Sequence, residues 1–442
     1  MKAIRIRWMA SALVAVSLLA GAGCSSGGDG TGGSGPSGSA GGAASGKTTT
    51  ITFWSWIGGI EDVVKTFNAS HSDIQVKLEV TPSGVAGGYL KLTNAITAGN
   101  APDLATIEYT NLPEYVSRGG LQPIGNLVDP AVLKDYPKAI TDQATFDGKV
   151  WGMPYDATPM VMYYRKDLLA QHGIEVPRTW DDYAKAAAKF HAEDPAGYLG
   201  SYFPNEPNQI AAYSWAAGAK WFGTAGNTWQ VNLTDPKSTA VGAYWQKLKN
   251  DKTVLVEKSW SENWGKMLKT SKLATVIGPP WAANNLAANT TGQSDKWAVA
   301  PLPTYDGKAS SGFWGGSTFA VSKNSKNAEA AATFATWLTH SPESINARTS
   351  AGRAVYPAHP DAYAVAAKNF KSTLFGKQDV FQVFKAADAS VPTGWMWGPA
   401  MNVTSTTLGD EQNSRSIPEA LRSAQQATVD EMSKRKLNVT GG

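Results

Sequence analysis

Tryptophan and carboxylate side chains are the residues of this chain best suited to act on a ligand. The sequence has 17 Trp among 442 residues, and charged residues make up only 17%, against roughly 25% in an average globular protein. Indole rings stack on apolar faces, and carboxylates accept hydrogen bonds from hydroxyl groups. A surface poor in charge and rich in Gly, Ser, Thr, Asn and Trp suits a neutral polar ligand better than an ionic one.

Motifs for metals, cofactors and ATP are missing from the sequence. There is no GxSxG elbow and no phosphate-binding loop. The five His are scattered without HxH or HExxH spacing, and the single Cys rules out an internal disulfide and a thiolate metal cluster. We therefore expect no metal, no cofactor and no catalytic residue.

The charge balance gives no case for nucleic acid. The net charge is +4, but Lys2, Arg5 and Arg7 lie in the first ten residues, and the chain from Cys24 onward has 37 basic and 36 acidic residues. A nucleic-acid-binding protein would be expected to carry a clustered basic patch.

The first 47 residues have the pattern of an export signal and a tether. A positive start is followed by an apolar run over 8–20 and by small residues at 21–23, which predicts a signal peptide over 1–23. Cys24 comes next and resembles the lipid-modified Cys of a bacterial lipoprotein, although Gly21 stands where an aliphatic residue is usual. The alternative is a plain signal peptide with an incidental Cys. The Gly/Ser-rich stretch that follows predicts a flexible tether over 24–47.

Strand and helix patterns alternate along the rest of the chain. Residues 48–56, 74–80 and 103–107 favour strands, and 60–68 and 89–98 have helical spacing. This β-α-β-α-β order predicts an α/β fold with mostly parallel sheets flanked by helices. A second α/β unit starts near residue 160. It contains strand patterns at 160–164, 274–277 and 297–301, and a helix that begins at Thr179 as its N-cap. The length of the chain predicts two lobes.

Four stretches, in order, resemble the sugar-binding group of bacterial extracellular solute-binding proteins that serve ABC importers, the group that includes maltose-binding protein. They cover nearly all of the chain after the tether. The stretches are ITFWSW at 51–56, AGNAPDLATIEYTNLPEYVSRGGLQPI at 98–124, GKVWGMPYDATPMVMYYRKDLLAQHGIEVPRTWDDY at 148–183, and IGPPWAANNL at 277–286 with the segment 297–339.

The resemblance implies a two-lobe fold with the ligand in the cleft between the lobes. It places 48–156 plus 313–357 in the first lobe and 157–312 plus 358–442 in the second. The crossings between lobes are expected at 154–159, 301–303 and 356–360, where prolines confine bending to a few dihedral angles.

The expected ligand contacts are aromatic and carboxylate residues at strand ends and glycine-rich turns. Trp56, Glu108 and Tyr109 follow strands, where open α/β sheets present ligands. In the proteins that this chain resembles, an aromatic residue after a turn such as 278–280 stacks on the sugar, which implicates Trp281. The other candidates are Asp156 at the first crossing, Trp314 with Gly315 and Gly316, Arg353, and Trp395 and Trp397, of which only one is expected to face the cleft. Trp54 and Trp180 are expected to pack inside.

The function implied is capture of a sugar, most simply an oligosaccharide, and its delivery to ABC permease subunits by a monomer anchored through Cys24 to the outer face of the cell membrane. Two alternatives stay open. A secreted glycoside hydrolase would need two carboxylates about 5–10 Å apart, for which Glu108 and Asp156 are the candidates. A surface carbohydrate adhesin is the other.

Overall fold

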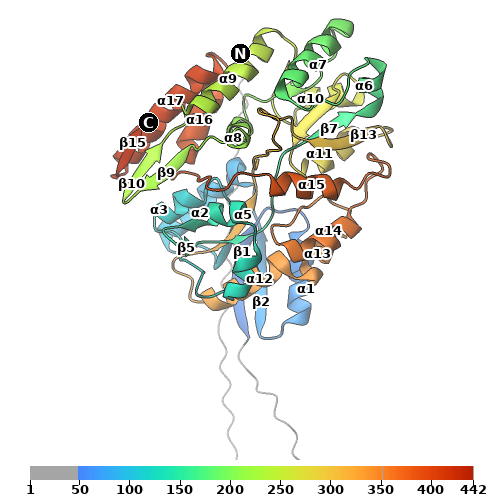
Figure 1. Cartoon of the computed structure of the whole chain (residues 1–442). Helices are drawn as coiled ribbons and strands as arrows, with labels where there is room; N and C mark the ends of the chain where they lie inside the picture. The colour runs from blue at the N-terminus through green and yellow to red at the C-terminus, as the bar shows by residue number, and fades with distance from the viewer. Residues whose placement is uncertain (1–47, 351, 442) are drawn as a thin grey trace, which may run out of the picture. The chain divides into compact units, whose positions relative to one another are not determined.

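The computed structural model describes residues 48–350 and 352–441, all within one compact unit, Lys47–Gly442 (Figure 1). The predicted signal peptide, Cys24 and the tether lie outside the described residues. Within the described ranges, no helix is long and apolar enough to cross a membrane.

The first lobe is built on a five-stranded sheet in the order β2-β1-β3-β14-β6. Strands β1 (Thr49–Ser55), β2 (Ile74–Val80) and β3 (Leu104–Glu108) are parallel. Strands β14 (Ser317–Val321) and β6 (Met153–Pro154) join from distant parts of the sequence, and β14 pairs antiparallel to both β3 and β6. The strands predicted over 48–56, 74–80 and 103–107 are thus confirmed, and the carboxyl ends of β1 and β3 meet at one edge of the sheet.

Helices cover this sheet because each has one apolar face. In α1 (Ile60–Ser70) the buried residues follow the helical repeat at Ile60, Val63, Val64 and Phe67. The other long helices are α2 (Gly88–Ala98), α12 (Ala328–His340) and α13 (Pro342–Thr349). The short elements of this lobe are η1 (Gly84–Ala86), α3 (Leu112–Ser117), α4 (Pro130–Asp135), α5 (Lys138–Ala144), β4 (Thr145–Phe146), β5 (Lys149–Val150), η2 (Pro360–Ala362) and α14 (Tyr363–Asn369). Because η2 and α14 pack on α13, the packing of this lobe continues beyond residue 357.

The second lobe has a three-stranded sheet in the order β12-β7-β13. Strand β7 (Val161–Arg165) runs antiparallel to both β12 (Thr275–Gly278) and β13 (Trp297–Pro301). Both strand pairings in this sheet are therefore antiparallel. The alternating pattern of the sequence predicts a mostly parallel sheet, and for this lobe that prediction is wrong. The reason is that β12 and β13 run the same way, joined through helix α11 (Ala282–Asn289), while β7, which directly follows the first crossing, lies between them and runs the opposite way.

Helices again surround this sheet (Figure 1). The predicted N-cap Thr179 is confirmed, since its side chain accepts a hydrogen bond from the backbone N–H of Asp182 in a capping box. The helices are α6 (Lys166–Gln171), α7 (Trp180–Glu193), α8 (Pro207–Ala216), α9 (Pro236–Asn250), α10 (Glu262–Lys269), α15 (Val380–Ala389), α16 (Met401–Glu411) and α17 (Ile417–Lys434). The short strands are β8 (Ser201–Tyr202), β9 (Phe222–Ala225), β10 (Thr228–Val231), β11 (Leu255–Val256) and β15 (Val439–Gly441).

The crossings between lobes lie side by side and are joined by backbone hydrogen bonds. The N–H of Tyr155 donates to Ser317 O at 2.9 Å, and the N–H of Ala157 donates to Tyr356 O at 3.0 Å. The crossing expected at 301–303 is displaced. Pro301 ends β13, and Thr304 still pairs with the second lobe, so the chain crosses near residues 311–316. The prolines at 301 and 303 lie before this crossing and do not confine its bending.

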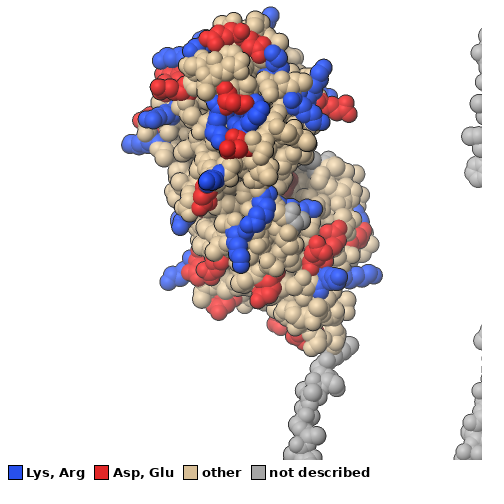
Figure 2. All heavy atoms as spheres, turned by 90° about the vertical axis from the view of Figure 1, so that its right-hand side faces the viewer, with Lys and Arg blue, Asp and Glu red and all other residues tan. Residues whose placement is uncertain are grey.

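Charges of both signs are interspersed over the face shown in Figure 2. Lys and Arg residues alternate with Asp and Glu residues along this face, and uncharged residues separate them. This distribution matches the nearly even charge count of the sequence.

The capping box of α17 gives a test of how this helix is held. The Ser416 side chain accepts from the N–H of Glu419, whose carboxylate accepts from the N–H of Ser416. We expect Ser416→Ala to lower the free energy of unfolding by about 1 kcal/mol, the usual cost of losing an N-cap. Urea denaturation measures this. Ser433→Ala, an exposed change in the last turn of the same helix, should leave stability nearly unchanged, and an equal loss in both variants would contradict the role of the cap.

Candidate ligand-binding cleft

Two cavities meet at Glu108 between the lobes. One, of about 280 Å³, is lined by the crossing segments around Asp156, Gly316 and Tyr356 and by Trp281; we call it the crossover cavity. The other, of about 910 Å³, is lined by residues of η1, α2 and β3 on one side and of α8 and α16 on the other; we call it the amide cavity. Together they form a cleft bounded by both lobes.

Trp281 is the aromatic wall of the crossover cavity. It directly follows the Gly-Pro-Pro turn at the end of β12, and Tyr163 fixes that turn by donating its hydroxyl to Pro279 O at 2.9 Å. Trp281 is half-buried, so part of its ring is open to the cavity. The structure places it where the sequence predicts.

Two further tryptophans support Trp281 from behind. The ring of Trp260 lies edge-on to it at 5.4 Å and 67°, and the ring of Trp314 at 6.0 Å and 71°. Trp314 is only 2% exposed and does not line either cavity. Trp260 has φ +57, a left-handed backbone conformation that bulky residues seldom adopt.

Glu108 lies at the junction of the two cavities, at the carboxyl end of β3. Its Oε2 accepts a hydrogen bond from the Tyr89 hydroxyl at 2.7 Å, and Tyr89 in turn packs edge-on to Trp56 at 5.7 Å. Burial raises the pKa of Glu108, the Tyr89 hydrogen bond opposes this, and the charge of Glu206 on the second lobe adds to the increase. Trp56 is half-buried and lines neither cavity, but it packs on Tyr89, which lines the amide cavity.

Glu206 is the acidic residue of the second lobe that faces Glu108. It lies directly before α8, and its Oε1 accepts from the Ser259 hydroxyl at 2.7 Å. Burial raises the pKa of Glu206, while hydrogen bonds from Ser259 and Trp314 lower it. The cleft therefore holds an acidic group from each lobe, each with its ionised form disfavoured by burial.

Asp156 stands at the first crossing, as the sequence predicts. Its Oδ1 accepts from the backbone N–H of Ser317 at 2.9 Å. Burial raises the pKa of Asp156 to about 6, against the effects of the Ser317 hydrogen bond and of Arg348. Arg348 is 1% exposed, and its guanidinium lies over the Tyr155 ring at 4.0 Å, so it supports the crossing from below.

Gly315 and Gly316 form a turn beside Asp156. Their φ angles are +78 and +97, which favour glycine. A Cβ at Gly316 would lie 2.8 Å from the Tyr109 ring. Tyr109 itself is 1% exposed and donates its hydroxyl to Asp156 O at 3.2 Å, so it forms the floor of the site and does not line either cavity.

Arg353 lines the crossover cavity from an exposed position. Its guanidinium lies against Gly58, in the space that a Cβ there would occupy. Next to it, the Asn284 side chain exchanges two hydrogen bonds with the backbone of Ala354, at 2.8 and 3.0 Å. This pair ties α11 of the second lobe to the last crossing.

Trp395 and Trp397 do not reach the cleft, so the expectation that one of them faces it is not met. Trp395 stacks on Trp215 at 4.9 Å and 4°, and Trp397 donates its indole N–H to Gln143 at 3.0 Å. Both are at most 1% exposed. The prediction expected the two side chains to point in opposite directions, so that only one would face the cleft. Instead the segment is enclosed by α5 of one lobe and α8 of the other, and both side chains are buried.

The two tryptophans expected to pack inside, Trp180 and Trp54, differ in their burial. Trp180 is 3% exposed inside the second lobe, as predicted. Trp54 is only half-buried and lies under the ammonium of Lys91 at 4.3 Å. Its side chain alternates with those of Phe53 and Ser55, which are buried, and so it points to the other face of the strand.

Several residues of the cleft have no clear signal in the sequence. Glu206 precedes a proline in an ordinary helix start, and Trp260 lies in a loop. The amide cavity is lined by five Asn side chains that come from both lobes: Asn111, Asn205, Asn208, Asn402 and Asn413. Asn111 donates to Asn402 at 2.8 Å across the cleft. Helical and strand periodicity could not have found residues brought together from such distant segments.

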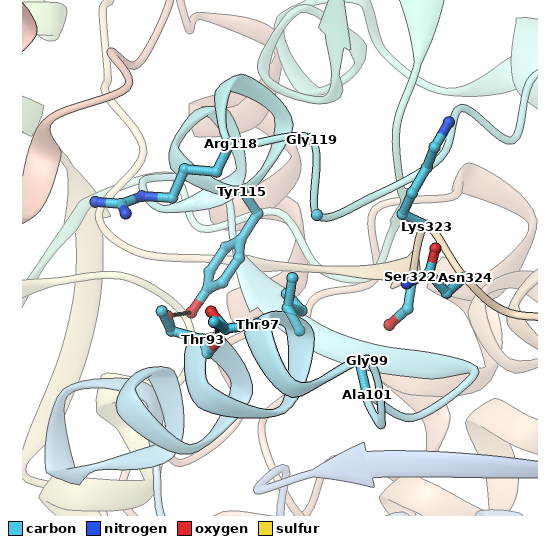
Figure 3. A pocket seen from close by; sticks show the side chains of 12 residues that line it. Thr93, Thr97, Gly99, Ala101, Tyr115, Arg118, Gly119, Ser322, Lys323 and Asn324 are labelled. Carbon is cyan, nitrogen blue, oxygen red and sulfur yellow. Dashed lines mark hydrogen bonds between the residues drawn. The ribbon is translucent and has the colours of Figure 1, made fainter. Parts of the chain in front are cut away.

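Another cavity, of about 490 Å³, lies in the first lobe between α2, α3 and the end of β14 (Figure 3). Figure 3 shows Tyr115 at its centre, with its hydroxyl next to Thr93, while the cationic ends of Arg118 and Lys323 point away from each other. None of the predicted ligand contacts lines it. Among the described residues, no group of three or more His, Cys, Asp or Glu is arranged to hold a metal ion.

Comparison with known proteins shows the family to which this two-lobe chain belongs. The model of the bacterial extracellular solute-binding protein family matches residues 53–343, so the chain belongs to that family. Its two-lobe fold agrees with this. The binding protein associated with an ABC transporter of B. animalis subsp. lactis Bl-04, solved with beta-1,6-galactobiose, superposes with a TM-score of 0.75 at 28% identity, covering 89% of this chain and 100% of that one.

Two characterised relatives are similar in sequence. The arabinooligosaccharide-binding protein of Bacillus subtilis (strain 168) is 26% identical over 318 residues, which cover 68% of this chain and 72% of that protein. The maltooligosaccharide ABC transporter solute-binding lipoprotein of Streptococcus pneumoniae serotype 4 (strain ATCC BAA-334 / TIGR4) is 28% identical over 301 residues, covering 63% and 64% respectively.

The turn at Gly316 offers a test of the floor of the site. Gly316→Ala would place a Cβ against the Tyr109 ring in a strained backbone conformation, and we expect a loss of about 1–3 kcal/mol in the free energy of unfolding. Gly315→Ala is a matched control, since its Cβ would meet nothing within 4 Å and only the strain applies. Denaturation curves that show equal losses for the two would argue against the Tyr109 contact.

The pKa of Asp156 predicts a pH dependence of stability. The folded state keeps a proton on Asp156 up to about pH 6, whereas the unfolded chain loses it near 3.8. The folded state therefore binds more protons in this window, and its stability falls as the pH rises through it. Asp156→Asn removes this effect, so the variant should gain stability relative to the wild type between about pH 4 and 6. Urea denaturation at a series of pH values measures the difference, and a constant difference would refute the assignment.

Proposed function

We propose that this protein captures a sugar, most simply an oligosaccharide, in the cleft formed by the crossover and amide cavities and delivers it to the permease of an ABC importer. The observation that carries the proposal is the convergence of the half-exposed Trp281 ring with Glu108, Asp156 and Glu206 from both lobes. An indole face suits the C–H face of a sugar ring, and carboxyl groups suit its rim of hydroxyls.

The size and lining of the cleft support a ligand of several rings. The amide cavity alone, at about 910 Å³, is near the upper end of the usual range for small-ligand sites, roughly 300–1,000 Å³. Its Asn side chains both donate and accept hydrogen bonds, which matches the mixed hydrogen bonding of neutral hydroxyls. Similarity to proteins named for arabinooligosaccharide, maltooligosaccharide and galactobiose binding supports the same ligand class.

Lobe closure supplies the mechanism. The lobes, with boundaries near residues 156 and 312 and in the segment after 357, would close over the sugar. A ligand that contacts both lobes favours the closed form by its difference in affinity for the two forms. Of the predicted contacts, Trp281, Glu108, Asp156, Gly315, Gly316 and Arg353 keep a direct role; Trp56, Tyr109 and Trp314 act as supports.

The proposal includes the anchor. We propose that Cys24 carries the lipid that holds the monomeric protein at the outer face of the bacterial cell membrane, consistent with the lipoprotein relative. Mass spectrometry of the protein extracted from membranes would show an acylated Cys24 at the N-terminus; an unmodified N-terminus from another cleavage site would contradict it.

The alternative of a glycoside hydrolase rests on Glu108 and Asp156. Incubation with neutral oligosaccharides separates the two functions, because a binding protein changes Trp fluorescence saturably and releases no new reducing ends. Accumulating reducing ends would overturn the proposal. The solute-binding family to which the chain belongs favours the binding protein.

Trp281 provides the mutational test. Trp281→Ala should weaken sugar binding by about 1–3 kcal/mol, the usual contribution of a stacked aromatic side chain, and calorimetry against a panel of mono- to tetrasaccharides measures it. Trp229→Ala is the matched control, since Trp229 is also half-buried but lies on β10 beside a cavity that shares no lining residue with the cleft. An unchanged dissociation constant in Trp281→Ala would remove this residue from the site.

A further inference from the structure

A large cavity on the second lobe, away from the cleft, has an aromatic platform of its own. It measures about 840 Å³ and is lined by the start of α7, the end of α8, α9 and the loop that follows β13. None of its residues lines either cavity of the cleft. Its platform is formed by Tyr305, Trp180 and Tyr244.

Tyr305 is held in place and is partly exposed. It is 39% exposed, one of four large hydrophobic side chains that stand out at the surface of the described residues. Its ring lies over Trp180 at 5.5 Å and 38°, and its hydroxyl donates to Tyr213 O at 3.4 Å. An aromatic ring fixed at both its face and its tip loses little conformational freedom when a ligand stacks on it.

The rest of the platform is equally fixed. Tyr244 lies edge-on to Trp180 at 5.6 Å and donates its hydroxyl to Trp180 O at 2.7 Å. Trp180 is 3% exposed, yet its indole Nε1–H has no acceptor among the described residues. The nitrogen is itself enclosed, so Trp180 contributes its ring as the buried base of the platform.

The polar lining of this cavity is neutral overall and rich in hydroxyls. Its charged residues are two of each sign, and the ammonium of Lys237 is already engaged by Gly218 O. The hydroxyl side chains around the platform are Thr179, Thr304, Ser310 and Ser390. This lining disfavours a strongly charged ligand.

We propose that the cavity around Tyr305 is a second carbohydrate site, which takes a neutral saccharide segment through stacking on Tyr305 and hydrogen bonds to the hydroxyl-lined wall. A partly exposed aromatic ring on a fixed aromatic base and a neutral rim of hydroxyl groups suit a pyranose or furanose ring. The site is separate from the cleft, so it can hold a polymer at the protein surface while the cleft takes a short chain.

Native affinity electrophoresis of the full-length protein tests the proposal. Gels contain one of three polysaccharides: soluble starch, arabinogalactan or glycol chitin. Trp281→Ala, with its cleft impaired, should still be retarded by at least one of them. Adding Tyr305→Ala or Ala309→Arg to Trp281→Ala should weaken this retardation at least tenfold in apparent dissociation constant. Ala309 is exposed and lines the cavity, so the arginine fills the site without removing a packed side chain.

The second site and the cleft can fail independently in these experiments. Val256→Ala removes another exposed apolar side chain outside the cavity and should leave retardation unchanged. Absence of retardation of Trp281→Ala in all three gels, or equal retardation with and without the Tyr305 and Ala309 changes, overturns the second site. Failure of the cleft proposal would instead show as wild-type protein that binds no short sugar in calorimetry.

Discussion

The pairing of the crossing segments is the constraint on which the binding cleft depends. Backbone hydrogen bonds from Tyr155 to Ser317 and from Ala157 to Tyr356 fix three passes of the chain side by side. This pairing sets Asp156 against the glycine turn at 315–316. Since backbone bonds of this kind are lost only at a high cost when buried, the carboxyl group, the turn and the last crossing keep their relative positions even if the lobes move.

Burial of acids gives the cleft its chemical character. The pKa values of Asp156, Glu108 and Glu206 are all raised first of all by burial. Burial leaves these carboxyl groups with little access to water, so sugar hydroxyls can take the place of water as their hydrogen-bond donors. The low dielectric strengthens each bond formed.

The sequence predicts the residues that follow strands and misses those that come together through packing. Glu108 was expected at the cleft because it follows a strand whose pattern is local, whereas Asp156 and Trp281 were expected there because the family resemblance places them at a crossing and after a glycine-proline turn. Glu206 and Trp260 were not, since their positions depend on how α8 and the loop before α10 pack against the other lobe. Trp395 and Trp397 show the reverse error: a glycine- and proline-bounded loop looks exposed, yet tertiary packing encloses it.

Polar contacts join the lobes on both sides of their boundary. Trp395 stacks on Trp215 within the second lobe, and beside it the Trp397 indole N–H donates to Gln143 and the Gly394 N–H donates to Asp142 of the first lobe. Across the cleft, the contacts are polar, such as Asn111 with Asn402 and Asn284 with Ala354, and water can replace them at little net cost. The stacked tryptophans belong to one lobe and stay together when the lobes separate, whereas the hydrogen bonds across the cleft can be exchanged for bonds to water. A sugar that contacts both Glu108 and Trp281 makes bonds to both lobes only in the closed form, and it favours that form by this difference in affinity.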